Sequence, residues 1–227
     1  MTIRTNRPMK LPLRIAVLIS GSGSNLQAII EYQKQHPELY EIVLVLSNKA
    51  DAYGLVRAQN AGIEHLAIDH RNYPDRAAFD AALQKELDVK QVDLVVLAGF
   101  MRILTDGFTE HYLGRMLNIH PSLLPKYPGL DTHQKAIDAG DSKHGLSVHF
   151  VTPELDGGPV VLQATVDVSP KDNAQSLQHK VHLKEHLAYP RVIAWFAQGK
   201  LKYQNGQAWF NQNPLEKPLQ YEEIESI

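Results

Sequence analysis

The sequence contains no cysteine, which excludes disulfide bonds, thiolate nucleophiles and cysteine-ligated zinc. It also has little excess charge of either sign, since 23 lysines and arginines against 25 aspartates and glutamates leave a formal net charge of −2. Such a balance gives no global field to hold a polyanion, so we expect no nucleic-acid partner. The absence of cysteine fits a cytoplasmic protein, and we expect that location.

Long hydrophobic runs are also absent. The longest apolar runs, 15–19 and 94–98, fall far short of the roughly 20 residues that span a bilayer, so we expect no membrane insertion. Residues 1–13 have no apolar stretch like that of a signal peptide and are expected to form an extension. With 44% hydrophobic and 21% charged residues, the 227-residue chain can bury a sizeable core, and we expect one domain over 1–227.

The first half of the chain alternates between two kinds of segment. Almost every position is apolar in the runs 15–19, 42–46 and 92–98, as expected of parallel strands covered on both faces. Helical stretches are predicted between them, at 26–35, 53–61 and 74–87. This alternation predicts an α/β fold with a doubly wound, mostly parallel sheet and a Rossmann-like N-terminal half. Ligands should then bind at the loops that follow the strands.

The second half changes character. Two β-rich segments, 147–152 and 160–168, are separated by turn-forming residues, which predicts an antiparallel excursion of the sheet. A helix is predicted over 173–198, broken or kinked near Pro190. A polar tail follows, with one short hairpin around Asn205-Gly206. We therefore divide the chain into a first half at 14–110, a second half at 111–199 and a tail at 200–227.

A glycine-rich loop, SGSGSN at 20–25, lies between a buried strand and a helix. Glycine lets the backbone turn its N–H groups toward an anion, and the helix N-terminus adds partial positive charge, so a phosphate is the expected guest. The loop lacks the third glycine of a dinucleotide fingerprint, because Leu26 stands there. A tight turn with Ser24 or Asn25 as an ordinary N-cap is the alternative.

The segment RMLNIHPSLLPKYPG at 115–129 places an amide and an imidazole two residues apart. In an extended strand Asn118 and His120 share one face, and Pro121 holds His120 away from helical angles. Such a pair suits carbonyl addition, in which one group stabilises an oxyanion and another moves a proton. His120 could equally be a structural histidine.

Further along, Asp156 lies in LDGGP, where we expect Gly157 and Gly158 to adopt backbone angles that other residues avoid. Its carboxylate can pair with a histidine, although a turn aspartate is the simpler interpretation. His144 and His149 are close in sequence, but no metal-ligand spacing is present, and we predict no metal.

Together these segments resemble the folate-dependent formyltransferases. The resemblance covers roughly residues 15–199 and is carried by SGSGSNLQAI at 20–29, SNKADAYGL at 47–55, AGFMRIL at 98–104, NIHPSLLPKYPGLDTH at 118–133 and HFVTPELDGGPV at 149–160. It implies that the formyl group of 10-formyltetrahydrofolate, a co-substrate, passes to the amine of glycinamide ribonucleotide in purine biosynthesis. A monomer or weak homodimer is expected.

The resemblance also implies that 14–110 is the phosphate-binding half and 111–199 the catalytic and folate-binding half, and it implies roles for individual residues. The implied catalytic residues are Asn118, His120 and Asp156. The implied ribonucleotide-binding residues are Gly23, Ser24, Asn25 and Glu185. The implied folate-binding residues are Arg76, Met101, Arg102, Ile103, Leu104, Asn118, Thr152, Pro153, Glu154, Leu155 and Asp156. The family often has glutamine where His182 stands, so the sequence departs from the family pattern beside Glu185.

Two alternatives remain open at this point. Formyltetrahydrofolate hydrolase would use the same catalytic residues with water as acceptor, but it usually carries a further N-terminal domain, and about 14 residues precede the first strand here. A non-catalytic phosphate-binding α/β module would need the glycine loop but not Asn118, His120 and Asp156.

Overall fold

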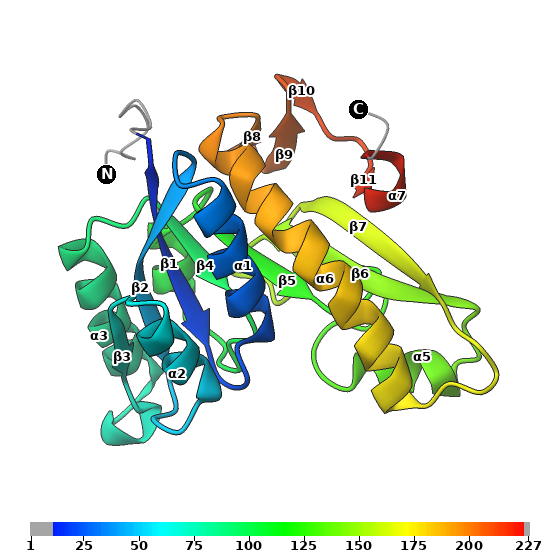
Figure 1. Ribbon diagram of the computed structural model, residues 1–227, viewed down its shortest axis with the longest axis horizontal. Helices are drawn as coiled ribbons and strands as arrows, with labels where there is room; N and C mark the ends of the chain where they lie inside the picture. Colours follow the sequence, from blue (N-terminus) through cyan, green and yellow to red (C-terminus); the bar gives the residue numbers. More distant parts are fainter. Residues whose placement is uncertain (1–10, 225–227) are drawn as a thin grey trace.

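The computed structural model describes residues 11–224 and is built on a central eight-stranded sheet (Figure 1). The strand order is β11-β7-β6-β5-β4-β1-β2-β3. The strands of this sheet are β1 (Leu13–Ile19), β2 (Tyr40–Ser47), β3 (His65–Ala67), β4 (Leu94–Leu97), β5 (Met116–His120), β6 (Lys143–Phe150), β7 (Val160–Asp167) and β11 (Leu219–Gln220). The helices are α1 (Ser24–Gln35), α2 (Tyr53–Asn60), α3 (Arg76–Val89), α4 (Asp106–His111), α5 (Thr132–Asp138), α6 (Ala174–Ala197) and α7 (Tyr221–Ile224), with a 3₁₀ turn at His70–Asn72.

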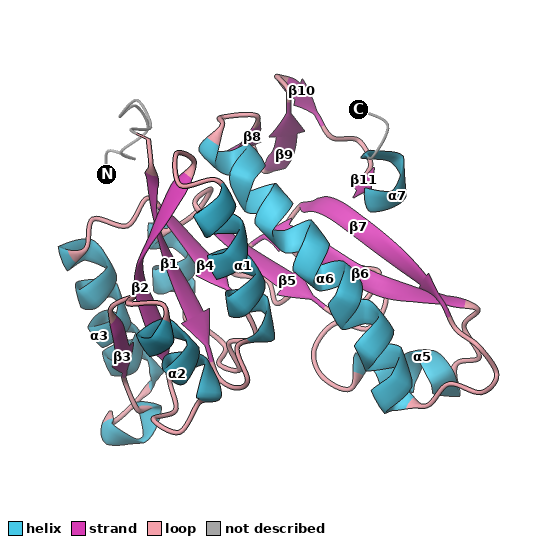
Figure 2. Ribbon diagram, in the orientation of Figure 1, coloured by secondary structure: helices cyan, strands magenta, loops and turns pink. Residues whose placement is uncertain are grey.

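The first half of the chain forms the parallel part of the sheet. Strands β3, β2, β1, β4 and β5 are neighbours in that order and all parallel, which confirms the Rossmann-like prediction. Figure 2 shows helices in front of this sheet and behind it. Ile15 and Val17 belong to a core cluster shared with α1, α2 and α6, whereas Ala16 and Leu18 belong to a cluster shared with α3 and α4. The sheet is therefore covered on both faces, as predicted.

The second half adds the antiparallel excursion. Strand β6 runs antiparallel to both β5 and β7, which confirms the sequence prediction. The register places Asn118 opposite His149 and His120 opposite Ser147. Because Met116 packs in the cluster of α3 and α4, the alternation of β5 directs Asn118 and His120 to that same side of the sheet.

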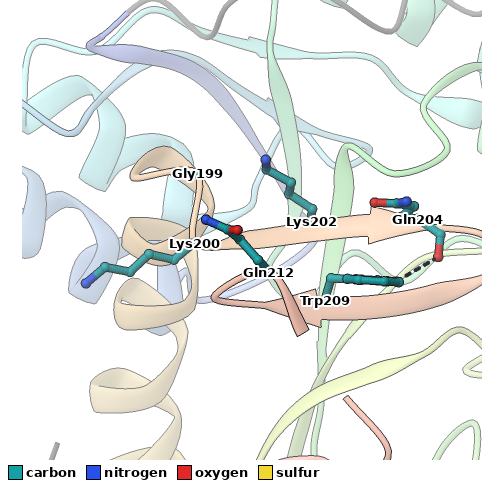
Figure 3. A pocket seen from close by; sticks show the side chains of 6 residues that line it. All are labelled: Gly199, Lys200, Lys202, Gln204, Trp209 and Gln212. Atoms are coloured by element: carbon teal, nitrogen blue, oxygen red, sulfur yellow. Dashed lines mark hydrogen bonds between the residues drawn. The ribbon is translucent and has the colours of Figure 1, made fainter. Parts of the chain in front are cut away.

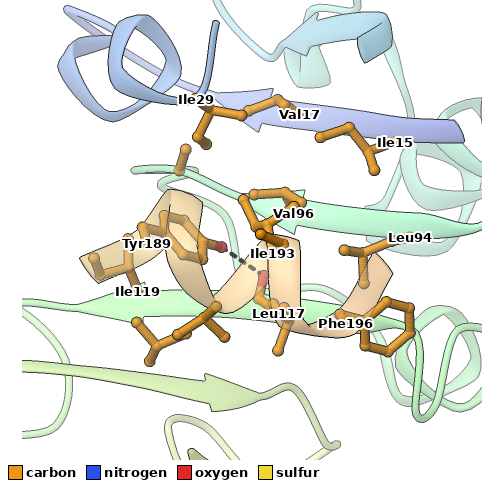
Figure 4. Close-up of a cluster of buried hydrophobic side chains, with 14 of the residues drawn as sticks. Ile15, Val17, Ile29, Leu94, Val96, Leu117, Ile119, Tyr189, Ile193 and Phe196 are labelled. Atoms are coloured by element: carbon orange, nitrogen blue, oxygen red, sulfur yellow. Dashed lines mark hydrogen bonds between the residues drawn. The ribbon is translucent and has the colours of Figure 1, made fainter. Parts of the chain in front are cut away.

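Of the two outcomes predicted for α6 at Pro190, a break or a kink, the break is wrong. The helix continues through Pro190 without a break, although proline has no N–H for the carbonyl four residues earlier. Most side chains from Ala188 to Ala197 are buried, so packing against the sheet outweighs one missing backbone hydrogen bond. The hydroxyl of Tyr189 lies 2.9 Å from the Leu97 carbonyl and 3.0 Å from the Leu117 carbonyl, which fixes the helix across β4 and β5 (Figure 4).

The C-terminal segment is more structured than a polar tail. The predicted hairpin is present as β8 (Leu201–Gln204) and β9 (Gln207–Phe210), and its turn residues Asn205 and Gly206 both have positive φ. A third strand, β10 (Asn213–Pro214), pairs with β9. Strand β11 then returns to the main sheet beside β7. The expected extension at 1–13 lies mostly outside the described residues, and β1 begins within it, at Leu13.

Candidate active site

The carboxyl ends of β1, β4 and β5 meet at one edge of the sheet, because these strands are parallel neighbours. The segments that follow them carry the glycine loop at 20–25, residues 98–104, and the loop after His120. This is the edge at which a doubly wound sheet binds its ligands. Most of the site residues expected from the sequence gather here.

Asn118 and His149 face each other across β5 and β6. The Asn118 Nδ2 lies 3.1 Å from the His149 Nε2, and the His149 Nδ1 lies 2.9 Å from the Phe150 carbonyl oxygen. Since a carbonyl can only accept, Nδ1 carries the proton and Nε2 accepts from the Asn118 amide. Burial lowers the pKa of His149, which favours this neutral form. His149 therefore fixes the orientation of the Asn118 amide.

His120 and Asp156 form a buried pair. The His120 Nδ1 is 3.4 Å from the Asp156 Oδ2, and the His120 Nε2 is 2.8 Å from the carbonyl oxygen of Tyr127. The other oxygen of Asp156, Oδ1, lies 3.7 Å from the His149 Nε2. The structure thus brings the three predicted catalytic residues into one cluster and adds His149 to them.

The loop that carries Asp156 differs from the expectation for its glycines. The left-handed angle belongs to Asp156 itself, with φ 50°, and neither Gly157 nor Gly158 lies in that region. Asp156 is held in this conformation because its Oδ2 accepts the Gly129 N–H at 2.9 Å. Gly158 is required for another reason: a Cβ there would lie 1.9 Å from the Phe150 carbonyl oxygen. The second glycine allows a close backbone approach, not an unusual turn.

The glycine loop opens α1 without an ordinary side-chain cap. Gly23 is the N-cap residue, with φ 69°, and no side chain caps the helix. The alternative interpretation, in which Ser24 or Asn25 is an ordinary N-cap, is therefore wrong. A Cβ on Gly23 would lie 2.6 Å from the Cα of Gly54, so the loop packs directly on the start of α2. The Arg57 Nε donates to the Ser22 carbonyl at 2.8 Å. The first-turn N–H groups of α1 thus remain directed out of the helix end.

Asn25 and Glu185 are in contact although far apart in sequence. The Asn25 Nδ2 donates to the Glu185 Oε2 at 2.8 Å, and the His182 Nε2 lies 3.9 Å from the same oxygen. Glu185 is only 3% exposed, and burial raises the pKa of its carboxyl group against the opposing effect of the Asn25 hydrogen bond. Two residues expected to hold the same substrate therefore lie side by side.

The residues expected to bind folate fall in two segments and one separate position. Leu104 is buried in the cluster of α3 and α4, against which Phe100 and Val151 also pack, so both segments lie on the side of the sheet that Asn118 and His120 face. Among the expected residues, Met101, Ile103, Pro153, Glu154 and Leu155 are exposed, and Arg102 and Thr152 are partly buried. Arg76 is the exposed first residue of α3 and takes no part in the hydrogen bonds given above.

Histidines near the site pair with protein groups. The His133 Nδ1 lies 3.1 Å from the His144 Nε2, and burial is the main cause that lowers the pKa of His133 to about 4. Within residues 11–224, no group of three or more histidines and acidic residues could hold a metal ion, and no helix is long and apolar enough to cross a membrane.

A hollow elsewhere on the surface contains none of the predicted site residues. It lies at the end of α6 and the β8–β9 hairpin and is lined by Gly199, Lys200, Lys202, Gln204, Trp209 and Gln212 (Figure 3). The indole of Trp209 donates to the Gln204 carbonyl at 3.2 Å. This hollow belongs to the C-terminal segment and is separate from the strand ends.

His149 is the site residue that sequence reasoning left without a role. From the sequence alone, the position of His149 two residues after Ser147 indicates only that the two side chains lie on the same face of a strand. It does not indicate which residue His149 contacts. The contact with Asn118 depends on the register in which β6 pairs with β5, and that register was not predicted from the sequence. The Tyr127 carbonyl and Gly129 amide are backbone groups, which carry no residue-type signal.

Comparison with known proteins places this geometry in a family. Residues 13–193 match the family model described as formyl transferase. The chain is similar to the phosphoribosylglycinamide formyltransferase of Escherichia coli (strain K12), with 53% identity over 199 residues that cover 88% of this chain and 94% of that protein. The corresponding enzyme of Haemophilus influenzae is 47% identical over 204 residues, covering 90% of this chain and 96% of that protein.

A solved structure agrees with these relatives. The phosphoribosylglycinamide formyltransferase of Coxiella burnetii has a TM-score of 0.89 and 50% sequence identity to this chain, and the match covers 92% of this chain and 99% of that one. The resemblance inferred from the motifs is therefore confirmed. The chain belongs to the formyl transferase family.

Proposed function

We propose that this chain transfers the formyl group of 10-formyltetrahydrofolate to the amine of glycinamide ribonucleotide, giving formylglycinamide ribonucleotide in de novo purine biosynthesis. The observation that carries the proposal is the cluster of Asn118, His120 and Asp156, which come from a strand and a distant loop. The names of relatives at 53% and 47% identity support the same reaction.

The reaction sets two charge requirements. Attack of the amine on the formyl carbon produces a tetrahedral oxyanion and a positively charged nitrogen, and the leaving folate nitrogen must gain a proton. A positioned oxyanion donor contributes about 2.7–4 kcal/mol, and general acid–base catalysis about 10²–10⁴-fold. Holding both substrates at one sheet edge can contribute about 7–11 kcal/mol through proximity.

Asn118 supplies the oxyanion donor. One of its two amide N–H groups is directed to the His149 Nε2, which fixes the plane of the amide. The other N–H is then free to point at the formyl oxygen as negative charge develops. A preorganised donor of this kind does not have to reorient during the reaction.

His120 supports the developing charge together with Asp156. Its two ring nitrogens face the Tyr127 carbonyl and the Asp156 carboxylate, an arrangement that suits a ring protonated on both nitrogens. We propose that the formyl oxygen replaces the Tyr127 carbonyl as acceptor of the Nε2 proton. Asp156 stabilises the imidazolium and, directly or through a water molecule, carries the amine proton toward the leaving folate nitrogen.

The ribonucleotide occupies the end of α1. Its phosphate accepts from the backbone N–H groups of Gly23, Ser24 and Asn25, where the helix dipole favours negative charge. Glu185, held by Asn25, contacts the ribonucleotide beyond the phosphate. This arrangement delivers the amine from the α1 side of the site toward Asn118 and His120.

The formyl donor binds between the two segments on the other side. Residues 101–104 and 152–156 supply exposed apolar side chains and backbone groups, and Arg76 completes the set. Asn118 and Asp156 belong to both the folate pocket and the catalytic cluster. The phosphate-binding half at 14–110 and the catalytic half at 111–199 thus meet at the reacting carbon.

Several further expectations belong to this proposal. The chain requires no metal, acts in the cytoplasm and binds neither nucleic acid nor membrane. We also propose that it acts as a monomer or a weak homodimer. Residues 1–13 and 200–227 have no proposed catalytic role.

Isotope labelling tests the reaction. With a carbon-13 formyl group on the donor, we expect the label in formylglycinamide ribonucleotide, identified by mass spectrometry, and tetrahydrofolate as co-product. Label found in formate alone would indicate the hydrolase. Binding of the ribonucleotide without any label transfer would indicate a phosphate-binding module.

A further inference from the structure

Residues 99–104, named here the donor segment, are held by few backbone contacts. They form no helix or strand, and Met101 and Ile103 are 61% and 57% exposed. At its start, the Ala98 N–H donates to the Leu18 carbonyl at 2.9 Å. Beyond its end, the Thr105 N–H donates to the buried carboxylate of Asp80 at 2.6 Å. Between these points the shape of the segment depends on other anchors.

Ser20 provides the anchor in the middle. The Met101 N–H donates to the Ser20 Oγ at 2.7 Å, and the Ser20 hydroxyl donates in turn to the Asn48 Oδ1. The Asn48 Nδ2 lies 3.5 Å from the His70 Nδ1. The Ser20 hydroxyl thus uses its proton toward Asn48, which leaves its oxygen to accept the Met101 N–H.

Burial makes this chain effective. Ser20 is 4% exposed and Asn48 is 2% exposed, so water has little access to their polar atoms. A backbone N–H that loses a buried acceptor is left without a hydrogen bond, which is unfavourable. The donor segment can remove this cost by moving so that water accepts from the N–H. Removing the Ser20 hydroxyl should therefore change where Met101 lies, not only how stable the fold is.

We propose that Ser20, oriented by Asn48, is a positioning residue that holds the donor segment in the shape that receives the formyl donor. The inference rests on the proposed function, which places folate at residues 101–104. Ser20 is also the first residue after β1 and the first residue of the glycine loop at 20–25. Its hydroxyl nevertheless points to Asn48 and Met101, so its loss should affect donor binding and leave phosphate binding intact.

The test compares three single variants with the wild-type chain. Ser20→Ala removes the anchor, Ser20→Thr keeps the hydroxyl, and Ser47→Ala is the matched control. Ser47 is also buried, and its Oγ accepts the Lys49 N–H at 3.0 Å, one residue from Asn48 but with no link to the donor segment. For each protein one measures kcat, the KM for each substrate, the Kd of tetrahydrofolate, and amide exchange over residues 99–104.

In Ser20→Ala we expect the KM for the formyl donor and the Kd of tetrahydrofolate to rise about three- to tenfold, the effect of one hydrogen bond. The KM for the ribonucleotide should change less than about twofold, and exchange over 99–104 should accelerate. Ser20→Thr should recover most of the donor affinity. Ser47→Ala should leave donor affinity and exchange unchanged.

Two results would overturn the inference. One is an unchanged donor KM with unchanged exchange in Ser20→Ala, and the other is an equal loss of affinity for both substrates. A wild-type chain that cannot use 10-formyltetrahydrofolate would instead overturn the proposed function, which separates the two failures.

Discussion

The Nδ2 of Asn118 and the Nε2 of His149 are 3.1 Å apart on adjacent antiparallel strands. The His149 Nε2 accepts this hydrogen bond because the ring proton is on Nδ1, which donates to the Phe150 carbonyl. The amide that we propose as the oxyanion donor is thus oriented by a neutral histidine. Burial keeps the pKa of His149 low, so the contact persists as the solution becomes mildly acidic.

Replacing His149 should therefore impair catalysis more than binding. In His149→Ala we expect kcat to fall about tenfold or more, because a misdirected oxyanion donor loses part of its effect, with the KM for each substrate little changed. Steady-state kinetics with each substrate varied in turn measures this. His179→Ala, which removes an exposed histidine of α6, is the control. A rise in KM with normal kcat would show that His149 serves binding instead.

The three proposed catalytic residues should behave as one unit. Each of Asn118→Ala, His120→Ala and Asp156→Ala should lower kcat by at least about a hundredfold, taking general acid–base catalysis as the guide. The double variant His120→Ala with Asp156→Ala should be little worse than either single one, since the carboxylate acts through the ring. Circular dichroism checks that each variant is folded. Near-normal turnover of His120→Ala would contradict the mechanism.

Replacing Gly23 should weaken binding of the ribonucleotide and not of folate. Gly23 has φ 69°, and a Cβ there would lie 2.6 Å from the Gly54 Cα. Gly23→Ala must therefore shift the glycine loop. We expect the KM for the ribonucleotide to rise about tenfold or more while folate binding is nearly unchanged. Gly62→Ala is the matched control, because Gly62 has the same φ and open space around it. Equal damage to both affinities would make the loop a general folding element.

The buried carboxyl group of Glu185 should lower the free energy of unfolding at neutral pH. Because burial raises its pKa in the folded state above the usual 4.5, the folded chain holds a proton that the unfolded chain has lost. Stability attributable to this group is therefore highest at low pH and falls as pH rises from about 4.5 through the folded pKa.

Glu185→Gln removes this penalty. In urea unfolding the variant should be more stable than wild type at pH 8, and the difference should close near pH 4, where the wild-type residue is protonated in both states. Its ribonucleotide affinity should fall, because the carboxylate is lost. A stability difference that does not vary with pH would contradict the assigned cause.

Much of the fold could be predicted because its strands are unusually clear. The apolar runs at 15–19 and 42–46 have no polar face, and only a sheet covered on both sides accommodates such strands. The short elements could not be predicted. β3 has three residues and α4 has six, too few for a periodic pattern to emerge.

The site was predictable where chemistry depends on residue type and not where it depends on the backbone. Asn118, His120 and Asp156 belong to motifs, but the Tyr127 carbonyl that meets His120 does not. The unbroken helix through Pro190 reflects burial on the sheet, which local propensity does not include. The left-handed angle of Asp156 likewise depends on a hydrogen bond to Gly129, 27 residues away.

The most direct measurement of the central claim is the consumption of 10-formyltetrahydrofolate by the purified chain with and without glycinamide ribonucleotide, with formate monitored in the same reaction. Direct transfer predicts that donor consumption depends on the ribonucleotide, matches formylglycinamide ribonucleotide mole for mole and releases little formate. Rapid formate release in the absence of the ribonucleotide would contradict the account.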